Sequence, residues 1–351
     1  MRILILNWKD LAHPAAGGAE VFTEQVARSL VERGHKVTVF AASVEGRPAR
    51  ELVEGVEVVR GGGTFTVYRA ARRFWFREGR GHYDVVLDEI NTRPFLTPRW
   101  LVGAPVVALI HQLAREIWWY ETPFPISVLG RYVLEPWWLR AYRRVPALTV
   151  SESSADSLTR YHGWRDVTVI PEGSTPHPSH SVEKEPDPTV VFLGRLVAMK
   201  RPADAIEAFS TLREQNPAAQ LWMIGDGPLL ADLRQDAQPG VTFLGRLERS
   251  DLVDRLARAH VLVTTSVREG WGLNVSEAAA CGTPSLGYRV PGLIDSVAAS
   301  GGGLVEPTPA ALGEALGDFF AGRLQLQPRP STVSWQEVAD AVERRLQEVV
   351  G

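Results

Sequence analysis

The most informative stretch of this chain reads Thr264-Thr265-Ser266-Val267-Arg268-Glu269-Gly270-Trp271-Gly272-Leu273-Asn274-Val275-Ser276-Glu277-Ala278. An apolar strand ends at Thr264 and runs into a glycine-broken turn that carries Glu269. A short helix, Asn274 to Cys281, follows it, carries Glu277 and is stopped by Gly282. Because amides at a helix start favour anions and glycines let a ligand approach the main chain, this strand–turn–helix unit predicts an α/β fold with an anion site.

Two structural alternatives account for the same residues. Asn274 and Glu277 have the spacing of a capping pair, in which Glu277 reaches back to the Asn274 amide. Glu269 is equally interpretable as a solvated loop acid. A functional interpretation therefore depends on a second feature of the chain.

That feature lies upstream and reads Val190-Val191-Phe192-Leu193-Gly194-Arg195-Leu196-Val197-Ala198-Met199-Lys200-Arg201-Pro202. A buried strand ends at Gly194, and a loop holding Arg195 and Lys200 leads into a helix with Pro202 in its first turn. Two cations at the carboxyl end of a strand suit a diphosphate at the crevice of an open α/β sheet. Either cation alone is an ordinary solvated charge, but the pair and the two-carboxylate turn together predict a nucleotide-sugar site.

These residues carry a family resemblance. Arg195 and Lys200, with Glu269 and Glu277, resemble the signature of the retaining glycosyltransferases of family 4, which have the GT-B fold. Further stretches resemble the family in the same order along the chain: Gly17-Gly18-Ala19-Glu20, His111, Gly225-Asp226-Gly227-Pro228-Leu229, Ala280-Cys281-Gly282-Thr283-Pro284, Pro291-Gly292-Leu293-Ile294-Asp295 and Gly303-Leu304-Val305-Glu306-Pro307.

The resemblance implies the GT-B form of the α/β class, with two Rossmann-like doubly wound domains whose parallel sheets face each other across a cleft. We expect an acceptor-side domain over residues 1–175 and a nucleotide-sugar donor domain over residues 189–330. Prolines with glycine and serines predict a linker over residues 176–188. Residues 331–351 are expected to form a helix that crosses back to the first domain.

Strand–helix alternation along the chain independently predicts parallel sheets covered by helices. A helix is expected from Ala19 to Arg33, stopped by Gly34, and another from Ser334 to Val350. The expected strands cover residues 2–7, 36–41, 84–88, 105–110, 147–150, 189–193, 220–224, 241–244, 260–264 and 283–286.

Composition bounds the class of protein. The 351 residues allow two or three domains, and 45% hydrophobic with 23% charged residues is typical of a globular protein. A net charge of −3 gives no strong field for nucleic acid, so no nucleic-acid partner is expected. A single cysteine, Cys281, excludes an internal disulfide framework and is interpreted as a small buried hydrophobe. No secretory signal or membrane-spanning stretch is visible, so we expect a cytoplasmic protein.

The activity that the resemblance implies is hexosyl transfer from a nucleotide diphosphate sugar, UDP- or GDP-linked, with retained anomeric configuration. Arg195 and Lys200, with the amides of Gly272 to Val275, would stabilise the departing diphosphate, so neither a metal nor another cofactor is required. Glu277 would accept from the ribose and Glu269 from the sugar. The remaining donor-binding positions expected from the resemblance are Gly17, Gly18, Gly225, Gly227, Gly270, Trp271, Gly272, Leu273 and Asn274.

Three first-domain residues have less specific signals. His111 follows an apolar strand, where a histidine is often structural, and the resemblance implies contact with the donor sugar. Asp88 and Glu89 end another strand and could line the acceptor site, although solvated strand-end acids are the favoured interpretation. Glu172 departs from the family, in which a polar amide often stands before Gly173.

Tryptophan and arginine are concentrated in two first-domain segments, 69–77 and 117–144. They suit an interfacial patch in which aromatic rings lie at headgroup level and arginines meet anionic lipid. Stacking on an acceptor and packing of helices against the sheet are the alternatives. The expected acceptor is a glycan, a lipid-linked sugar or a small molecule, in cell-wall or polysaccharide biosynthesis, with peripheral contact to the inner membrane face.

Other functions share this fold class. A nicotinamide-dependent oxidoreductase is disfavoured because no G-x-G-x-x-G follows an expected strand. A nucleotide-sugar hydrolase or epimerase with the same fold, and a non-catalytic nucleotide-sugar binding protein, remain the alternatives.

Overall fold

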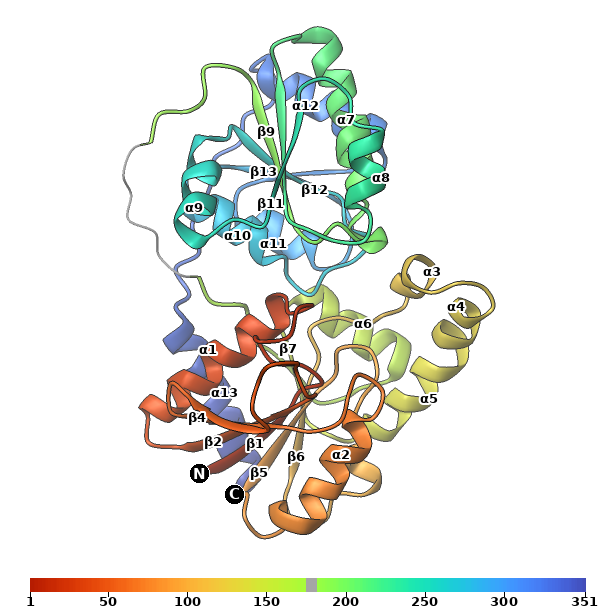
Figure 1. Ribbon diagram of the computed structural model, residues 1–351, viewed down its shortest axis with the longest axis vertical. Coiled ribbons are helices and arrows are strands. Elements are labelled where there is room, and N and C mark those ends of the chain that lie inside the picture. Colours follow the sequence, from red (N-terminus) through yellow and green to blue (C-terminus); the bar gives the residue numbers. More distant parts are fainter. Residues whose placement is uncertain (175–181) are drawn as a thin grey trace. The chain divides into compact units, whose positions relative to one another are not determined.

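The computed structural model describes residues 1–174 and 182–351 and divides into two compact units. Unit 1 comprises residues 1–115, 128–173 and 333–351, and unit 2 comprises residues 116–127 and 174–332. Each unit is built on one central sheet (Figure 1). Residues 176–181 of the predicted linker lie outside the described residues, and the remainder, 182–188, leads into the first strand of unit 2.

Unit 1 contains an eight-stranded sheet in the order β3-β4-β2-β1-β5-β6-β7-β8, in which only β3 is antiparallel to its neighbour. Central strands such as β1 are apolar along their length because helices cover both faces of a parallel sheet. The strands are β1 (Arg2–Leu6), β2 (Lys36–Ala41), β3 (Arg50–Val53), β4 (Val56–Arg60), β5 (Val85–Glu89), β6 (Val106–Leu109), β7 (Ala147–Thr149) and β8 (Val167–Val169).

The helices of unit 1 include the long carboxyl-terminal helix α13, which packs against α1 (Figure 1). Val338, Val342 and Leu346 form its buried face, and Glu343 binds Arg33 and His35 at 3.1 and 2.8 Å. The helical segments are α1 (Gly18–Glu32), α2 (Val67–Phe74), η1 (Trp75–Gly79), η2 (Thr97–Arg99), η3 (Gly130–Leu134), α5 (Glu135–Leu139), η4 (Arg140–Tyr142), α6 (Glu152–His162) and α13 (Trp335–Val350). The short helix α4 (Ile126–Leu129) spans the boundary between the units at residues 127 and 128.

Unit 2 contains a six-stranded parallel sheet in the order β11-β10-β9-β12-β13-β14. Its strands are β9 (Thr189–Leu193), β10 (Gln220–Ile224), β11 (Val241–Gly245), β12 (Val261–Thr264), β13 (Ser285–Tyr288) and β14 (Gly303–Val305). Its helical segments are α3 (Ile117–Glu121), η5 (Ala198–Lys200), α7 (Pro202–Gln215), α8 (Leu230–Gln235), α9 (Arg249–Arg258), α10 (Leu273–Ala280), α11 (Leu293–Ala299) and α12 (Pro309–Phe320).

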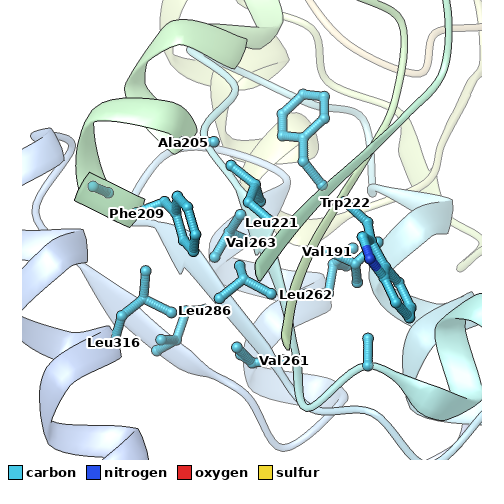
Figure 2. Close-up of a cluster of buried hydrophobic side chains, with 14 of the residues drawn as sticks. Val191, Ala205, Phe209, Leu221, Trp222, Val261, Leu262, Val263, Leu286 and Leu316 are labelled. Atoms are coloured by element: carbon cyan, nitrogen blue, oxygen red, sulfur yellow. The ribbon is translucent and has the colours of Figure 1, made fainter. Parts of the chain in front are cut away.

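The core of unit 2 lies where α7 and α12 pack on the sheet (Figures 1 and 2). Phe209 of α7 and Leu316 of α12 meet side chains of the central strands, among them Leu262 and Leu286. At the end of α10, Cys281 is half-buried rather than fully buried, and burial raises the pKa of its thiol to about 11.

Each expected strand is present, and the additional strands lie at or next to the sheet edges. The short strands β3, β4, β8 and β14 were not expected, and β3 makes the sheet of unit 1 mixed instead of wholly parallel. Most of β3 is exposed, so it lacks the apolar run by which the central strands were found. No helix within the described residues is long and apolar enough to cross a membrane.

The core of unit 2 gives a direct stability prediction. Phe209→Ala removes a fully buried ring and leaves a cavity, so we expect the free energy of unfolding to fall by about 3–5 kcal/mol. Phe65→Ala is the matched control, because that ring is 80% exposed, and we expect a change within about 0.5 kcal/mol. Denaturant titration of both variants measures the difference, and equal effects would contradict the assignment of this core.

Candidate active site

The loop after β9 is held in place by the loop after β10. The Leu196 amide donates to the Asp226 carbonyl at 2.9 Å, and the Leu229 amide donates to the Leu196 carbonyl at 3.1 Å. A Cβ on Gly225 would lie 2.0 Å from the Gly194 oxygen, so packing requires glycine at this position. These contacts fix the backbone on both sides of Arg195, whose side chain is exposed.

The turn after β12 brings Lys200 to Glu269. The Thr265 hydroxyl lies 2.8 Å from the carbonyl oxygens of Lys200 and Arg201 and ties the turn to η5. The Lys200 ammonium forms an ion pair with Glu269 Oε1, which also accepts a hydrogen bond from the Ser266 hydroxyl at 2.5 Å. Glu269 is buried, so the alternative of a solvated loop acid is wrong.

The start of helix α10 differs from the predicted capping pair of Asn274 and Glu277. Gly272 precedes its first residue with φ +102°, a conformation that favours glycine. The Asn274 amide nitrogen Nδ2 donates to the Leu193 carbonyl at 2.9 Å, which links the helix start to the end of β9. Glu277 binds Arg249 at 2.6 Å. The proposed Asn274–Glu277 capping pair is therefore wrong, and Glu277 keeps a partly exposed carboxylate.

One expected amide donor is already engaged. The Val275 amide donates to the Gly272 carbonyl at 2.9 Å and to Asn274 Oδ1 at 3.0 Å. Of the four amides expected to receive an anion at this helix start, those of Gly272, Leu273 and Asn274 remain. Trp271 is half-buried and donates from its indole nitrogen to the Ser276 hydroxyl at 2.9 Å, which fixes its ring beside the turn.

Unit 2 thus assembles the two predicted cations and the two predicted carboxylates from adjacent elements. Arg195 and Lys200 follow β9, Glu269 follows β12 and Glu277 lies on α10. The carboxyl ends of parallel strands share one edge of a sheet, which is where open α/β folds bind ligands. The arrangement offers positive charge and amides to a diphosphate and offers carboxylates to hydroxyl groups.

Unit 1 places the glycine pair at the start of α1. The Gly17 amide donates to Glu20 Oε2 at 2.6 Å, and Lys9 lies 3.3 Å from the same oxygen. Burial raises the pKa of Glu20, and the nearby Lys9 charge opposes that shift. A Cβ on Gly17 would make only an ordinary 3.9 Å contact, and Gly18 has no positive φ. Packing therefore does not require glycine at position 17.

His111 lies between two buried carboxylates. Its Nε2 is 3.4 Å from Glu89 Oε1, and its Nδ1 is 3.5 Å from Glu172 Oε1. Burial alone lowers the pKa of His111, but Glu172 and Glu89 outweigh it and raise the pKa to about 10. The imidazole is therefore charged at neutral pH. Glu172, where the family often has an amide, supplies one of the two charges that hold the proton.

Asp88 and Glu89 are not solvated strand-end acids. Successive side chains of a strand point to opposite faces, so these two carboxylates enter different surroundings. Asp88 is fully buried and accepts hydrogen bonds from the Thr97 and Tyr142 hydroxyls, each at 2.5 Å. Glu89 accepts from the Thr23 hydroxyl at 2.5 Å and pairs with His111. Asp88 fastens the fold here, and neither acid is exposed to an incoming acceptor.

Sequence reasoning missed four residues that shape these sites: Lys9, Glu20, Thr265 and Ser266. Glu20 had a usable signal, because an acid three positions after a helix start often binds the first amide. Thr265 and Ser266 stood inside the informative stretch but have no distinctive spacing. Lys9 is one charge in a loop and gave no signal at all.

The described residues contain no group of three or more histidine, cysteine or acidic side chains arranged to hold a metal ion. Unit 1 does contain a cavity of about 260 Å³, which Lys9 and Glu20 help to line. Its walls come from one face of α1, the strands β2 to β4 and the loop that follows β1, and they combine valines with charged side chains.

The ion pairs of His111 make stability depend on pH. Because the folded pKa is raised from 6.5 to about 10, the stabilisation is complete below about pH 6.5 and is lost as pH rises through about 10. We expect His111→Gln to reduce the free energy of unfolding most below pH 6.5, with the difference from wild type shrinking by a few kcal/mol, as an order of magnitude, towards pH 10.

Denaturant titrations across this pH range measure the difference. His82→Gln is the matched control because His82 is exposed and makes no ion pair among the described residues. A His111→Gln deficit that stays constant with pH would contradict the charged imidazole.

Comparison with known proteins places the chain in a family. Two family models match it: Glycosyltransferase Family 4 over residues 16–176 and Glycosyl transferases group 1 over residues 175–330. A glycogen synthase of Mycobacterium tuberculosis is 26% identical over 391 residues, covering 97% of this chain and 93% of the relative. A D-inositol 3-phosphate glycosyltransferase of Thermobifida fusca is 30% identical over 333 residues, covering 80% and 75%.

Solved structures share the fold at lower identity. Sucrose-phosphate synthase from Thermosynechococcus elongatus superimposes with a TM-score of 0.74 at 19% identity, covering 100% of this chain and 95% of that one. HepE of Anabaena, solved with UDP-glucose, gives 0.62 at 17% identity, covering 100% and 97%. Together with the two α/β units and the residues assembled in them, these matches identify the chain as a glycosyltransferase of family 4 with the GT-B fold.

Proposed function

We propose that the protein is a retaining hexosyltransferase that uses a UDP- or GDP-linked sugar and needs no metal. The observation that carries this proposal is the assembly of Lys200, Ser266 and Glu269 beside the loop of Arg195 and the start of α10. It combines groups for a diphosphate with groups for sugar hydroxyls at one edge of one sheet.

In the proposed reaction the bond from the anomeric carbon to the diphosphate oxygen breaks, and a bond from that carbon to the acceptor oxygen forms on the same face. The proton of the acceptor hydroxyl passes to the departing phosphate oxygen. Arg195, Lys200 and the amides of Gly272, Leu273 and Asn274 stabilise the negative charge that develops on the diphosphate. No protein nucleophile is required.

The Lys200–Glu269 ion pair prepares both residues for the donor. Each group holds the other in place before the ligand arrives, so little reorganisation is needed when a phosphate approaches Lys200 and hydroxyls approach Glu269. Glu277 accepts from the ribose. Its partner Arg249 is half exposed, so this carboxylate can exchange the arginine for ribose hydroxyls.

Residues of unit 1 complete the donor contacts in this proposal. Gly17 and Gly18 let the main chain approach the diphosphate, and this explains glycine at position 17, where packing does not require it. Gly225 and Gly227 have a different explanation, because Cβ atoms there would lie 2.0 and 2.4 Å from carbonyl oxygens of the Arg195 loop. His111, held as an imidazolium, contacts the donor sugar or its phosphate.

The proposed acceptor is a glycan, a lipid-linked sugar or a small molecule, and the proposed process is cell-wall or polysaccharide biosynthesis in the cytoplasm at the inner membrane face. The UDP donor is supported by HepE, which was solved with UDP-glucose. A hydroxyl-bearing acceptor is supported by the names of the relatives, a glycogen synthase and an inositol-phosphate glycosyltransferase.

Ligand-induced thermal stabilisation tests the donor site. We expect one class of nucleotide sugar in a panel of UDP-, GDP- and ADP-sugars to raise the melting temperature in the presence of EDTA, as saturating ligand does. Arg195→Ala and Glu277→Ala should lose the shift, whereas Arg323→Ala, an exposed arginine paired with Asp318, should keep it. Stabilisation by NAD(H) alone would contradict the proposal.

Transfer itself requires a second measurement. Lys200→Ala should lower kcat by about 10²–10³-fold, because it removes charge stabilisation from the leaving diphosphate. Proton NMR of the product should show the anomeric configuration of the donor. Release of free sugar with every acceptor offered would instead identify a hydrolase.

Two glycine-to-alanine variants separate ligand approach from packing. Gly17→Ala should change the free energy of unfolding by less than about 1 kcal/mol and lower transfer at least tenfold. Gly225→Ala should destabilise unit 2, because its Cβ would overlap the Gly194 carbonyl. A Gly17→Ala enzyme with full activity would contradict the role proposed for the glycine pair.

A further inference from the structure

An almost continuous helical segment runs through α4, η3, α5 and η4 and ends at Tyr142, and from residue 128 onward it belongs to unit 1. Its inner face is firmly attached to the fold. Glu135 accepts hydrogen bonds from the Ala114 and Arg115 amides at 2.7 and 2.9 Å, and the Tyr142 hydroxyl donates to Asp88 at 2.5 Å. The orientation of the segment about its own axis is therefore fixed by buried polar contacts.

The opposite face of this segment is apolar and exposed. Leu129, Tyr132, Val133 and Trp137 are 47%, 62%, 53% and 52% exposed. Leu129, Val133 and Trp137 recur every four residues, with Tyr132 three residues after Leu129, which puts all four on one side of a helix. An amphipathic surface helix normally turns its apolar stripe towards the core. Here the stripe faces solvent, and contiguous apolar patches of this kind mark binding surfaces.

The charges around this stripe are positive. Arg140, Arg143 and Arg144 are exposed directly after it, and the Arg99 guanidinium lies 4.2 Å from the Trp137 ring. Between residues 128 and 144 the sequence has one acidic residue, Glu135, and that carboxylate is buried and hydrogen-bonded to the main chain. The exposed face therefore presents apolar and aromatic groups beside cations, without a compensating acid.

The other tryptophan- and arginine-rich segment, 69–77, differs. Trp75 is fully buried and Phe74 nearly so, and both belong to the core formed by α2 and the sheet. Of the three aromatic rings in that segment only Phe76 is exposed, at 49%, and it lies beside Arg72 without further apolar side chains in a stripe. Of these two segments, only 128–144 exposes an apolar stripe beside its arginines.

We infer that the face of residues 128–144 binds the surface of a membrane that contains anionic phospholipids. The aliphatic side chains enter the boundary of the acyl region, Tyr132 and Trp137 lie at headgroup level, and the arginines meet lipid phosphates. Charge complementarity favours lipid, because the exposed charged side chains of residues 128–144 are all arginines and the headgroups of anionic phospholipids carry negative charge. The inference does not depend on the transferase chemistry.

Co-sedimentation with vesicles tests the inference. We expect the full chain to bind vesicles of mixed phosphatidylcholine and phosphatidylglycerol, to bind phosphatidylcholine vesicles at least tenfold more weakly, and to be released by salt. The variant Tyr132→Ser/Val133→Ser/Trp137→Ser removes the apolar stripe and should lose binding at least tenfold. Arg140→Gln/Arg143→Gln/Arg144→Gln should do the same through charge.

Matched controls change the same chemistry elsewhere in unit 1. Arg69→Gln/Arg72→Gln/Arg73→Gln removes three exposed arginines from the other segment, and Leu52→Ser/Phe65→Ser removes exposed apolar side chains. Both controls should bind like wild type. Each variant should also keep the wild-type melting temperature and its stabilisation by nucleotide sugar, which shows that it is folded.

Three outcomes would overturn the inference. The first is no binding of wild type to the anionic vesicles, and the second is equal loss in the 69–73 control. The third is a dimer by analytical ultracentrifugation that the apolar variant abolishes, in the absence of vesicle binding, which would assign this face to a second copy of the chain. A transferase that fails the donor test but binds vesicles would leave the inference standing.

Discussion

The proposed donor site of this enzyme depends on a main-chain contact that only glycine permits. Gly225 and Gly227 let the loop after β10 lie directly on the loop after β9, so the backbone around Arg195 is fixed without any ligand. Thr265 then fixes the Lys200 end of the same loop to the turn after β12. The strands β9, β10 and β12 each contribute one short loop to the same sheet edge, and the loop after β9 is hydrogen-bonded to the other two. Rigid placement of the cations follows from packing between loops.

Unit 1 uses a different physical principle, the burial of charge. Glu20, Glu89 and Glu172 lie in the interior with Lys9 and His111, and each acid contacts a cation within 3.5 Å. Isolated charges at such depth would be costly, but removing one partner from a buried pair costs more than the pair itself. Single substitutions within the cluster are therefore destabilising. The cluster also keeps the imidazole of His111 cationic at neutral pH. The two units prepare positive charge by unrelated means.

The central strands, the loop that carries Lys200, the turn that carries Glu269 and the family could be predicted from the sequence. Apolar runs and glycine-flanked charges have strong local signals. It did not reveal β3, whose side chains are mostly exposed. The joint acceptor role given to Asp88 and Glu89 ignored strand alternation, which sends adjacent side chains to opposite faces. Buried pairs such as Lys9–Glu20 and His111–Glu172 escaped prediction because their partners are distant in sequence or carry no motif. Sequence also could not separate the packed segment 69–77 from the exposed segment 128–144, since both have the same composition.

The single cysteine gives the molecule an internal reporter. Cys281 follows the last residue of α10, the helix that begins after the turn of Glu269. Burial raises the pKa of its thiol to about 11. Because the thiolate is the reactive form, alkylation of the folded protein is slow at neutral pH, and opening of this helix end restores ordinary reactivity. With no second thiol in the chain, the rate of labelling measures local opening of unit 2 alone. Opening near the turn that carries Glu269 is therefore accessible to mass spectrometry without any engineered probe.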